Sequence, residues 1–419
     1  MFEKLEEKPL NYWEEESYIG VIQKRENITI EEINDAINNI RKDNEIEIVS
    51  IKELTSKEVG NIIFKYEENR YQIYFYPESY NYNNSFYWGN FQISEEEERR
   101  LKESKICIKF AMKFSNDAKK SFKAQLRLML AMLPNSVCVV DESSERSLPV
   151  KWAKMIADSQ YEINARDLFM VQAVSDEKDK VWLHTHGLAR CGITELEILE
   201  SNKEHFQTHY NIINSYASML LENEKYKTEM KEGYFIGYLC NGHPIVVTHR
   251  IWTEGLKEYE ESILGGFSDR IQEHNTKTSP IFIYKTEQDQ IESKISKVTE
   301  YDNLIELNPI FFFSKEETEN MKNIAQERFK MLDTKILKDA NKIEAKIGIL
   351  VGEEENEYMW AEILNIEENN IKARIQEDAY QIKDLKEGSI IETSIDSIAD
   401  WQIEYEGKII KPDNVYFYR

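Results

Sequence analysis

The chain has 419 residues, of which 41% are hydrophobic and 31% are charged, and its formal net charge is −24. A chain of this length and apolar content is expected to form two or three folded domains, which excludes disorder of the whole chain. The strong acidity and the lack of a dense run of Lys and Arg argue against binding to nucleic acid or to anionic membranes.

The first hundred residues predict a strand, a helix, a second strand and a hairpin, in that order. The helix is expected to begin after Thr29, because Glu32 three residues later completes a capping-box pattern, and to end near Arg41. The expected strands cover residues 18–23, 45–50, 61–66 and 71–76. We assign residues 1–100 to an N-terminal α/β unit.

The same order of elements recurs in the next part of the chain. The expected strands cover residues 106–114, 136–140, 168–174 and 181–185, and the expected helices cover 116–133 and about 150–157. Two copies of one strand–helix–strand–hairpin order predict an α+β fold with two ferredoxin-like, split βαβ-type units related by duplication. Residues 101–313 form the expected second domain.

The later part of this second domain predicts one more helix and a hairpin. The helix covers residues 203–222, and the hairpin strands 234–239 and 245–250 enclose Asn241-Gly242, a strong signal for a tight turn. Further strands are expected at 280–284 and 309–313.

Residues 314–419 form the expected third domain, a helix followed by a small β-rich module. Ser314 has Glu317 three residues later, the spacing of a helix start, and the helix is expected to reach about residue 332. Short strands and turns follow. Residues 345–419 contain eight Lys or Arg and seventeen Asp or Glu, so this module is as acidic as the rest of the chain.

Cysteine use and the lack of targeting patterns indicate a cytoplasmic protein. Cys107, Cys138, Cys191 and Cys240 are widely spaced and form no CxxC pair, which fits a reducing compartment. The N-terminus lacks the pattern of a signal peptide, and no apolar run reaches the roughly eighteen residues of a membrane span.

The most suggestive segment lies near the middle of the chain. It reads Val181-Trp182-Leu183-His184-Thr185-His186-Gly187-Leu188-Ala189-Arg190-Cys191-Gly192, and Glu195-Leu196-Glu197 follows it. Alternate residues of a strand share a face, so His184 and His186 are expected on one face together with Trp182.

One interpretation of this segment is a metal site, with zinc as the candidate ion. His184 and His186 on a strand and His205 and His209 at i and i+4 of a helix are both spacings that allow metal ligation. Glu195 and Glu197 could complete the site or act as a general base. This interpretation predicts a metal-dependent hydrolase.

The alternative interpretation is structural, and we favour it because neither HExxH nor another sharp metal signature is present. In this case the two histidines hydrogen-bond across a turn, Gly187 and Gly192 give the backbone freedom, and Arg190 pairs with Glu195 or Glu197. No cofactor is then expected. The sequence contains no glycine-rich phosphate loop, so it gives no indication of a nucleotide site.

Three residues of the tail are candidates for a binding surface. Trp360 and Trp401 could line a groove for a peptide or a ligand, as aromatic residues do in small β modules. The alternative, which we favour, is that both fill the core of a small barrel. Asp400 directly precedes Trp401.

Two segments resemble bacterial families without an established activity. The segment from Trp182 to Leu188, with Arg190-Cys191-Gly192 and Glu195-Leu196-Glu197, resembles the characteristic sequence motif of a bacterial domain of unknown function. The tail resembles a second uncharacterised bacterial domain, the YegJ-like type, and has Tyr358 where His is expected. The tail residues that carry this resemblance are Glu357-Tyr358-Met359-Trp360, Lys386-Glu387-Gly388 and Ile398-Ala399-Asp400-Trp401.

The sequence therefore favours a cytoplasmic, non-enzymatic binding protein, of the immunity type, that sequesters a protein partner such as a basic toxin. The acidic surface, the lack of a sharp catalytic signature and the separate β module motivate this hypothesis. The alternatives are the metal-dependent hydrolase and a structural or regulatory subunit whose ligand pocket contains His184, His186 and Arg190.

Overall fold

The computed structural model describes residues 15–23, 25–82, 88–176, 179–222, 233–239, 242–270, 276–305, 310–311, 314–351 and 356–419. Its contacts divide the chain into two compact units. The first unit comprises Met1–Gly89, Glu96–Leu148 and Asn164–Phe313, and the second comprises Asn90–Glu95, Pro149–Ile163 and Ser314–Arg419. Among the described helices, none is long and apolar enough to cross a membrane.

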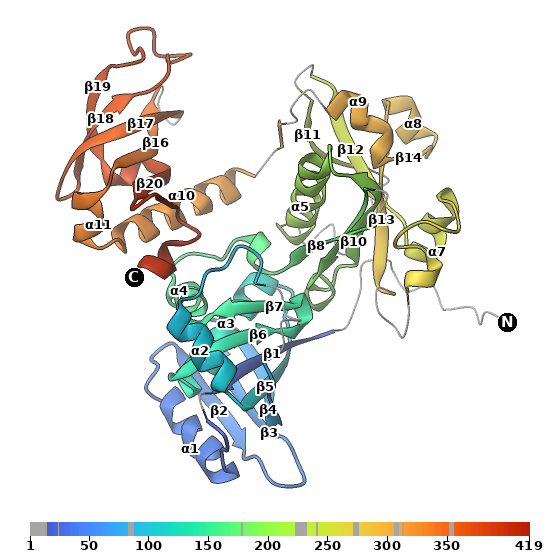
Figure 1. Ribbon diagram of the computed structural model, residues 1–419, viewed down its shortest axis with the longest axis vertical. Coiled ribbons are helices and arrows are strands. Elements are labelled where there is room, and N and C mark those ends of the chain that lie inside the picture. The colour runs from blue at the N-terminus through green and yellow to red at the C-terminus, as the bar shows by residue number, and fades with distance from the viewer. Residues whose placement is uncertain are drawn as a thin grey trace. The chain divides into compact units, whose positions relative to one another are not determined.

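The first sheet of the first unit has seven strands in the order β2-β3-β4-β5-β1-β6-β7 (Figure 1). Their bounds are β1 (Glu16–Gln23), β2 (Ile46–Lys52), β3 (Gly60–Tyr66), β4 (Asn69–Ser79), β5 (Ile106–Lys113), β6 (Ser136–Asp141) and β7 (Arg146–Pro149). The short helix η1 (Glu142–Ser144) joins β6 to β7. Helices α1 and α3 of this unit contact each other.

The expected division into two successive repeats does not correspond to this sheet. Strands β5 and β6, which we assigned to a second repeat, flank β1 and pair with it antiparallel. The hairpin of that repeat lies instead in a different sheet. The reason is that β1 is buried along nearly its whole length, with Ile19, Val21 and Ile22 inaccessible to solvent, so it takes a central position with a neighbour on each edge.

The second sheet of the first unit has the order β15-β11-β12-β13-β10-β9-β8, and β14 pairs with β13. Its strands are β8 (Met170–Ser175), β9 (Lys180–His186), β10 (Glu195–Asn202), β11 (Tyr234–Tyr238), β12 (Pro244–His249), β13 (Thr278–Tyr284), β14 (Ser296–Lys297) and β15 (Ile310–Phe311). The hairpin expected around Asn241-Gly242 corresponds to β11 and β12, although Asn241 lies outside the described residues, as do Cys240, Pro309 and residues 312–313.

Helices cover and connect the sheets of the first unit. They are α1 (Ile30–Ile40), α2 (Glu95–Glu103), α3 (Ala118–Met132), α5 (Phe206–Glu222), α7 (Trp252–Gly255), α8 (Glu287–Ile291), α9 (Asp302–Ile305), η2 (Ala165–Asp167), η3 (Ala189–Cys191), η4 (Leu256–Glu258), η5 (Phe267–Asp269) and η6 (Val298–Tyr301). Helix α5 packs across β8, β10 and β11 (Figure 1). Thr29 caps α1 in the predicted capping box with Glu32.

The second unit is built around a six-stranded antiparallel sheet of order β19-β18-β17-β16-β20-β21. Its elements are α4 (Val150–Asp158), α10 (Lys315–Lys330), α11 (Thr334–Asp339), β16 (Lys342–Leu350), β17 (Asn356–Glu367), β18 (Asn370–Ile375), β19 (Ile390–Ser394), η7 (Ile395–Ser397), β20 (Ile398–Tyr405), β21 (Lys408–Ile410) and η8 (Val415–Tyr418). Helix α10 packs on β20. The predicted α+β class and the β-rich C-terminal module are confirmed.

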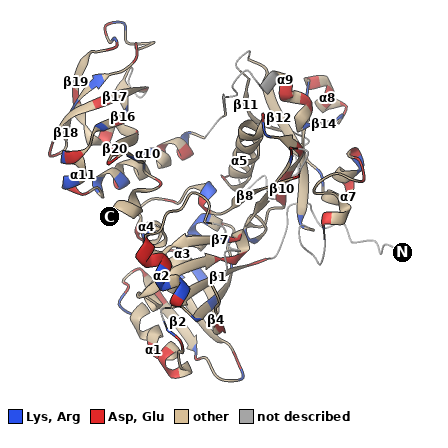
Figure 2. Cartoon of the chain, viewed as in Figure 1, with Lys and Arg blue, Asp and Glu red and all other residues tan. Residues whose placement is uncertain are grey.

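Charged side chains are spread over the described elements of both units. Figure 2 shows acidic residues on α1, α8 and α9, whereas α2 carries both signs of charge and α11 carries basic residues. The charge of −24 is therefore distributed over many elements.

Candidate functional site

The central histidine segment forms strand β9 and the turn that follows it. Trp182 stacks on His184 with ring centroids 4.1 Å apart, and the ring of His186 lies 4.9 Å from that of His184. The three rings thus share one face of β9, as strand alternation predicts. His184 is 1% exposed and His186 is 8% exposed, so this aromatic row is buried.

Both imidazoles are held by one side chain of the neighbouring strand. The Nε2 atoms of His184 and His186 lie 3.0 Å and 2.9 Å from Oε1 of Gln172, which lies on β8 at the register position opposite His184. The Nδ1 atom of His186 lies 3.6 Å from a carboxylate oxygen of Glu145. The pair is therefore a hydrogen-bonded bridge between two strands, whereas the sequence suggested a contact across a turn.

Glu197 lies on β10 at the register position opposite His184, and a guanidinium holds it. Arg270 donates to both of its carboxylate oxygens, at 2.7 Å and 2.9 Å, and Trp182 donates its indole N–H at 3.0 Å. Trp252 packs against the same guanidinium, 5.2 Å from ring centroid to Cζ. Burial raises the pKa of Glu197, and Arg270 acts in the opposite direction.

Glu195 closes the turn after β9. Its carboxylate accepts the Thr185 hydroxyl at 2.6 Å and the backbone N–H groups of Gly187 and Ala189 at 2.8 Å and 2.9 Å. Burial raises the pKa of this carboxyl group. Gly187 has φ +110°, and a Cβ there would lie 2.6 Å from the carbonyl oxygen of Leu168, so only glycine fits this turn.

The expected pairing of Arg190 with Glu195 or Glu197 is wrong. Arg190 lies in η3, and its guanidinium binds both carboxylate oxygens of Asp141 at the end of β6, at 2.6 Å and 2.8 Å. The turn at Gly187 directs η3 toward the first sheet, where Arg190 also donates to the Leu168 carbonyl at 2.7 Å.

Asp141 is fully buried between two guanidinium groups. Burial alone would raise the pKa of its carboxyl group, but Arg190 and Arg146 hold that pKa below its usual range. The anion and the two cations therefore form a charged link between the first and second sheets.

The second histidine pair has a partner of its own. His205 Nδ1 and His209 Nε2 lie 3.3 Å and 2.9 Å from the two carboxylate oxygens of Asp302, and Ser201 bonds the other nitrogen of His209 at 2.8 Å. Within the described ranges, no group of three or more His, Cys, Asp or Glu side chains is arranged to hold a metal ion. Ligand geometry thus gives the zinc interpretation no support.

The two tryptophans of the C-terminal module have different environments. Trp401 is 1% exposed and donates its indole N–H to the Ala325 carbonyl of α10 at 2.7 Å, so it belongs to the core. Trp360 is only partly buried. Asp400 is exposed and accepts the backbone N–H of Trp401 at 2.8 Å.

The loop between β18 and β19 is fastened by carboxylates. Glu357 accepts the backbone N–H groups of Tyr380, Gln381 and Ile382, the last two at 3.0 Å and 3.3 Å. Asp378 accepts the backbone N–H of Glu387 at 3.0 Å, which ties the two ends of the loop together. The side chain of Tyr380 projects from this loop and is 94% exposed.

Family comparisons divide the chain into three matches. Residues 17–162 match the N-terminal and residues 171–282 the C-terminal model of the family described as "Protein of unknown function (DUF4026)". Residues 311–411 match the model described as "Uncharacterized protein conserved in bacteria (DUF2314)". The chain carries both DUF4026 domains and a DUF2314 domain. No curated protein and no solved structure matches the chain.

These matches assign the candidate residues to domains. The buried motif around His184 and Glu197 belongs to the C-terminal DUF4026 domain, and Trp360, Tyr380 and Trp401 belong to the DUF2314 domain. Both DUF4026 domains contribute to the charged link, because Asp141 lies in the N-terminal match and Arg190 in the C-terminal match.

Sequence reasoning missed several residues that hold the motif in place. Gln172 and Arg270 are isolated polar residues without a local signal, and they reach the motif only through strand pairing and a loop after η5. Tyr380 was missed because a lone tyrosine in a polar stretch does not indicate its own exposure. Asp141 gave a weak signal, since it is a carboxylate at the end of a buried strand.

Proposed function

We propose that the chain is a non-enzymatic binding protein that holds a basic segment of a protein partner on its DUF2314 domain. The observation that carries the proposal is an aromatic surface, which we define as Tyr358, Trp360 and Tyr380. Sequestration of a basic toxin, as in immunity proteins, is the form of binding that we favour, and we assign the DUF2314 domain to the YegJ-like type.

Tyr358 and Trp360 lie on the face of the third sheet that does not pack on α10. Residues of β17 alternate between the buried Met359 and Ala361 and the partly exposed Tyr358 and Trp360. The ring of Tyr358 lies over Gly348 of β16, where a Cβ would come within 2.9 Å of it. A partly exposed aromatic face of this kind is available to a partner.

The loop adds Tyr380 to the same end of β17. Its backbone is bound to Glu357, the neighbour of Tyr358, and Glu377 accepts the backbone N–H of Trp360 at 3.2 Å. A large side chain that is 94% exposed on a loop with several hydrogen bonds is preorganised for contact. Aromatic residues in such positions dominate binding energy at interfaces.

Two carboxylates on this face of the sheet, Glu344 and Asp400, can meet the charges of a basic partner, and Lys342 and Lys346 lie beside them. Hydrogen bonds from Lys342, Gln376 and Gln402 lower the pKa of Glu344 to about 2, so this carboxylate of the same face stays anionic. Asp400 is a second exposed carboxylate, opposite Lys346 of β16, which also faces Trp360. Lys and Arg side chains of a partner can stack on the rings while their charges meet these carboxylates.

The buried motif of the DUF4026 domains supports a bracing role. Its carboxylates pair with guanidinium groups and its imidazoles bond Gln172, and His184, Arg190 and Glu197 are at most 3% exposed. A substrate would have to break these contacts before it reached a reactive group. The motif therefore holds the architecture, and the DUF2314 face meets the partner.

Calorimetric titration with a Lys- and Arg-rich peptide tests the proposal. We expect saturable binding that weakens with added salt, and none for a peptide with Gln in place of every Lys and Arg. Tyr380→Ala and Trp360→Ala should each weaken binding about tenfold.

The matched control is Ile409→Ala, because Ile409 is 46% exposed on the edge strand β21 of the same sheet. This variant should bind as the unchanged chain does. Equal binding by the Tyr380, Trp360 and Ile409 variants would contradict the proposal, as would equal binding of the two peptides.

A further inference from the structure

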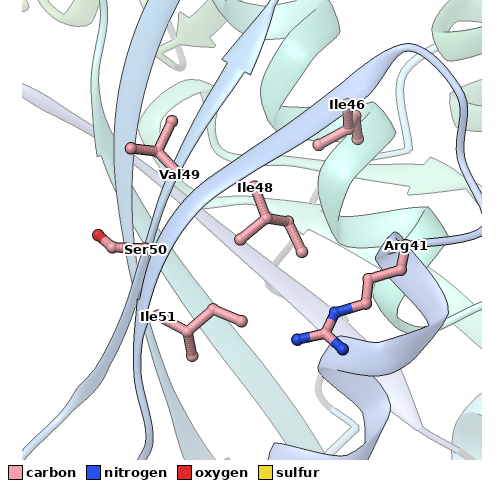
Figure 3. Close-up of a pocket in the computed structure, with 6 residues that line it drawn as sticks. All are labelled: Arg41, Ile46, Ile48, Val49, Ser50 and Ile51. Atoms are coloured by element: carbon pink, nitrogen blue, oxygen red, sulfur yellow. The ribbon is translucent and has the colours of Figure 1, made fainter.

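We propose that a groove between the end of α1 and the edge strand β2 binds an amphipathic carboxylate, a small molecule with an alkyl chain and a carboxylate head. The groove is a cavity of about 490 Å³ (Figure 3). Its lining residues are Arg41, Ile46, Ile48, Val49, Ser50 and Ile51. This volume lies within the usual range of sites for small ligands. The proposal is independent of the partner surface on the DUF2314 domain.

A β-bulge gives the groove its apolar wall. The register of β2 against β3 shifts between Ile48 and Ser50, and Val49 is the extra residue. As a result, Ile48 and Ile51 both point toward the side where the guanidinium of Arg41 lies, whereas Val49 and Ser50 point away (Figure 3). A regular strand would send Ile48 and Ile51 to opposite faces.

Arg41 supplies a positive charge that its surroundings do not neutralise. The nearest carboxylates in the sequence, Asp43 and Glu45, both pair with Arg127, at 2.8 Å and 3.0 Å. On β2 itself, Glu47 pairs with Lys65 at 2.8 Å. Within the described residues no carboxylate pairs with Arg41, although the chain has 24 more negative than positive charges.

An apolar wall beside an uncompensated guanidinium selects the class of ligand. The alkyl chain would cover Ile48 and Ile51, both only partly buried, and the carboxylate would take charge-assisted hydrogen bonds from Arg41. A peptide strand added to the edge fits less well. The bulge twists this edge, and β2 carries the charged residues Glu47 and Lys52. Both features disfavour pairing of β2 with another strand.

Titration of the full chain with octanoate, followed by calorimetry, tests the inference. We expect one saturable site for octanoate and far weaker binding of octanol, which lacks the charge. Arg41→Gln should weaken octanoate binding about ten- to hundredfold. Ile51→Ala should weaken the binding of both octanoate and octanol.

The matched control is Arg70→Gln, because Arg70 is an exposed guanidinium on β4 of the same sheet. It should leave octanoate binding unchanged, and the melting temperatures should show that all variants fold. Arg41 also sits at the C-cap of α1, where a cation stabilises a helix end, so a purely capping role would change stability without changing binding.

Three results would overturn the inference: no saturable binding of octanoate, equal binding by the Arg41→Gln and Arg70→Gln variants, or concentration-dependent dimers blocked by Ile48→Lys in place of ligand binding. Loss of peptide binding on the DUF2314 domain would not affect it, because the two experiments use different ligands and different residues.

Discussion

The guanidinium of Arg190 joins the two sheets of the first unit, because η3 carries it after β9 and Asp141 receives it at the end of β6. Both side chains are fully buried, so neither charge is compensated by water. Burying two charges is costly in itself, and the pair is tolerated only while both partners are present.

We therefore expect Arg190→Met to lower the free energy of unfolding by about 3–5 kcal/mol, because it leaves Asp141 as a buried charge beside Arg146 alone. Urea denaturation followed by circular dichroism measures this loss. Arg25→Gln is the control, since Arg25 pairs with Glu32 on the surface and both side chains are about half exposed. A loss no larger than that of the control would contradict the bracing role of Arg190.

The buried imidazole of His249 is expected to make the stability of the fold depend on pH. Burial lowers the pKa of His249 to about 4, and its Nδ1 shares a hydrogen bond of 2.6 Å with the Tyr216 hydroxyl. The unfolded chain binds a proton at this residue near pH 6.5, so the unfolded state takes up more protons than the folded state between pH 6.5 and 4. Stability is therefore expected to fall as the pH drops through this window.

The expected contribution of His249 is a loss of about 2 kcal/mol between pH 7 and pH 5. Unfolding free energies of the unchanged chain and of His249→Gln at both pH values isolate this contribution, because other titrating groups affect both proteins alike. An equal loss in the two proteins would show that His249 does not titrate as its burial requires.

At the scale of elements, Glu357 makes the largest set of backbone contacts among the carboxylates that fasten the loop between β18 and β19. Glu357 holds three successive N–H groups of this loop. We expect Glu357→Ala to free the loop and to raise the rate of trypsin cleavage after Lys383 and Lys386 severalfold. Mass spectrometry of timed digests locates the cuts.

Glu392→Ala is the control for this digestion, because Glu392 is an exposed carboxylate on the adjoining strand β19. It should leave the rate of cleavage in the loop unchanged. If Glu357→Ala and Glu392→Ala gave the same rate, the loop would not be fastened by Glu357, and the preorganisation of Tyr380 would lose its basis.

Local elements were predictable from the sequence, whereas their partners were not. The capping box of Thr29 and the alternation along β9 are short-range patterns, so they predicted α1 and the shared face of Trp182 and His184. Strand order depends on contacts between distant segments. The position of β1 between β5 and β6, and the pairing of Arg190 with Asp141, therefore had no local signal.

At the scale of the whole molecule, family matches and compact units divide the chain differently. Residues 149–162 fall within the N-terminal DUF4026 match, yet they belong to the second unit. In this unit the ring centroids of Trp152 of α4 and Phe91 are 5.0 Å apart, and those of Phe91 and Tyr416 are 6.3 Å apart. The C-terminal part of the chain, Ser314–Arg419, thus forms one compact unit with two segments that precede it by many residues.

We assign a bracing role to the DUF4026 motif and a binding role to the DUF2314 domain. The DUF4026 motif is buried and bonded to itself, and the DUF2314 domain presents aromatic residues and carboxylates to solvent. Residue types alone did not make this distinction, because both segments contain tryptophans, carboxylates and basic residues. Only exposure, which follows from the tertiary structure, separates Trp360 and Tyr380 from Trp182 and Trp401.

Hydrogen–deuterium exchange of the full chain, with and without a Lys- and Arg-rich peptide, shows which of the two regions meets the partner. We expect slower exchange in the peptide's presence at residues 357–361 and 376–388, with no change at residues 182–197. Protection confined to residues 182–197, with none in the DUF2314 domain, would contradict this expectation.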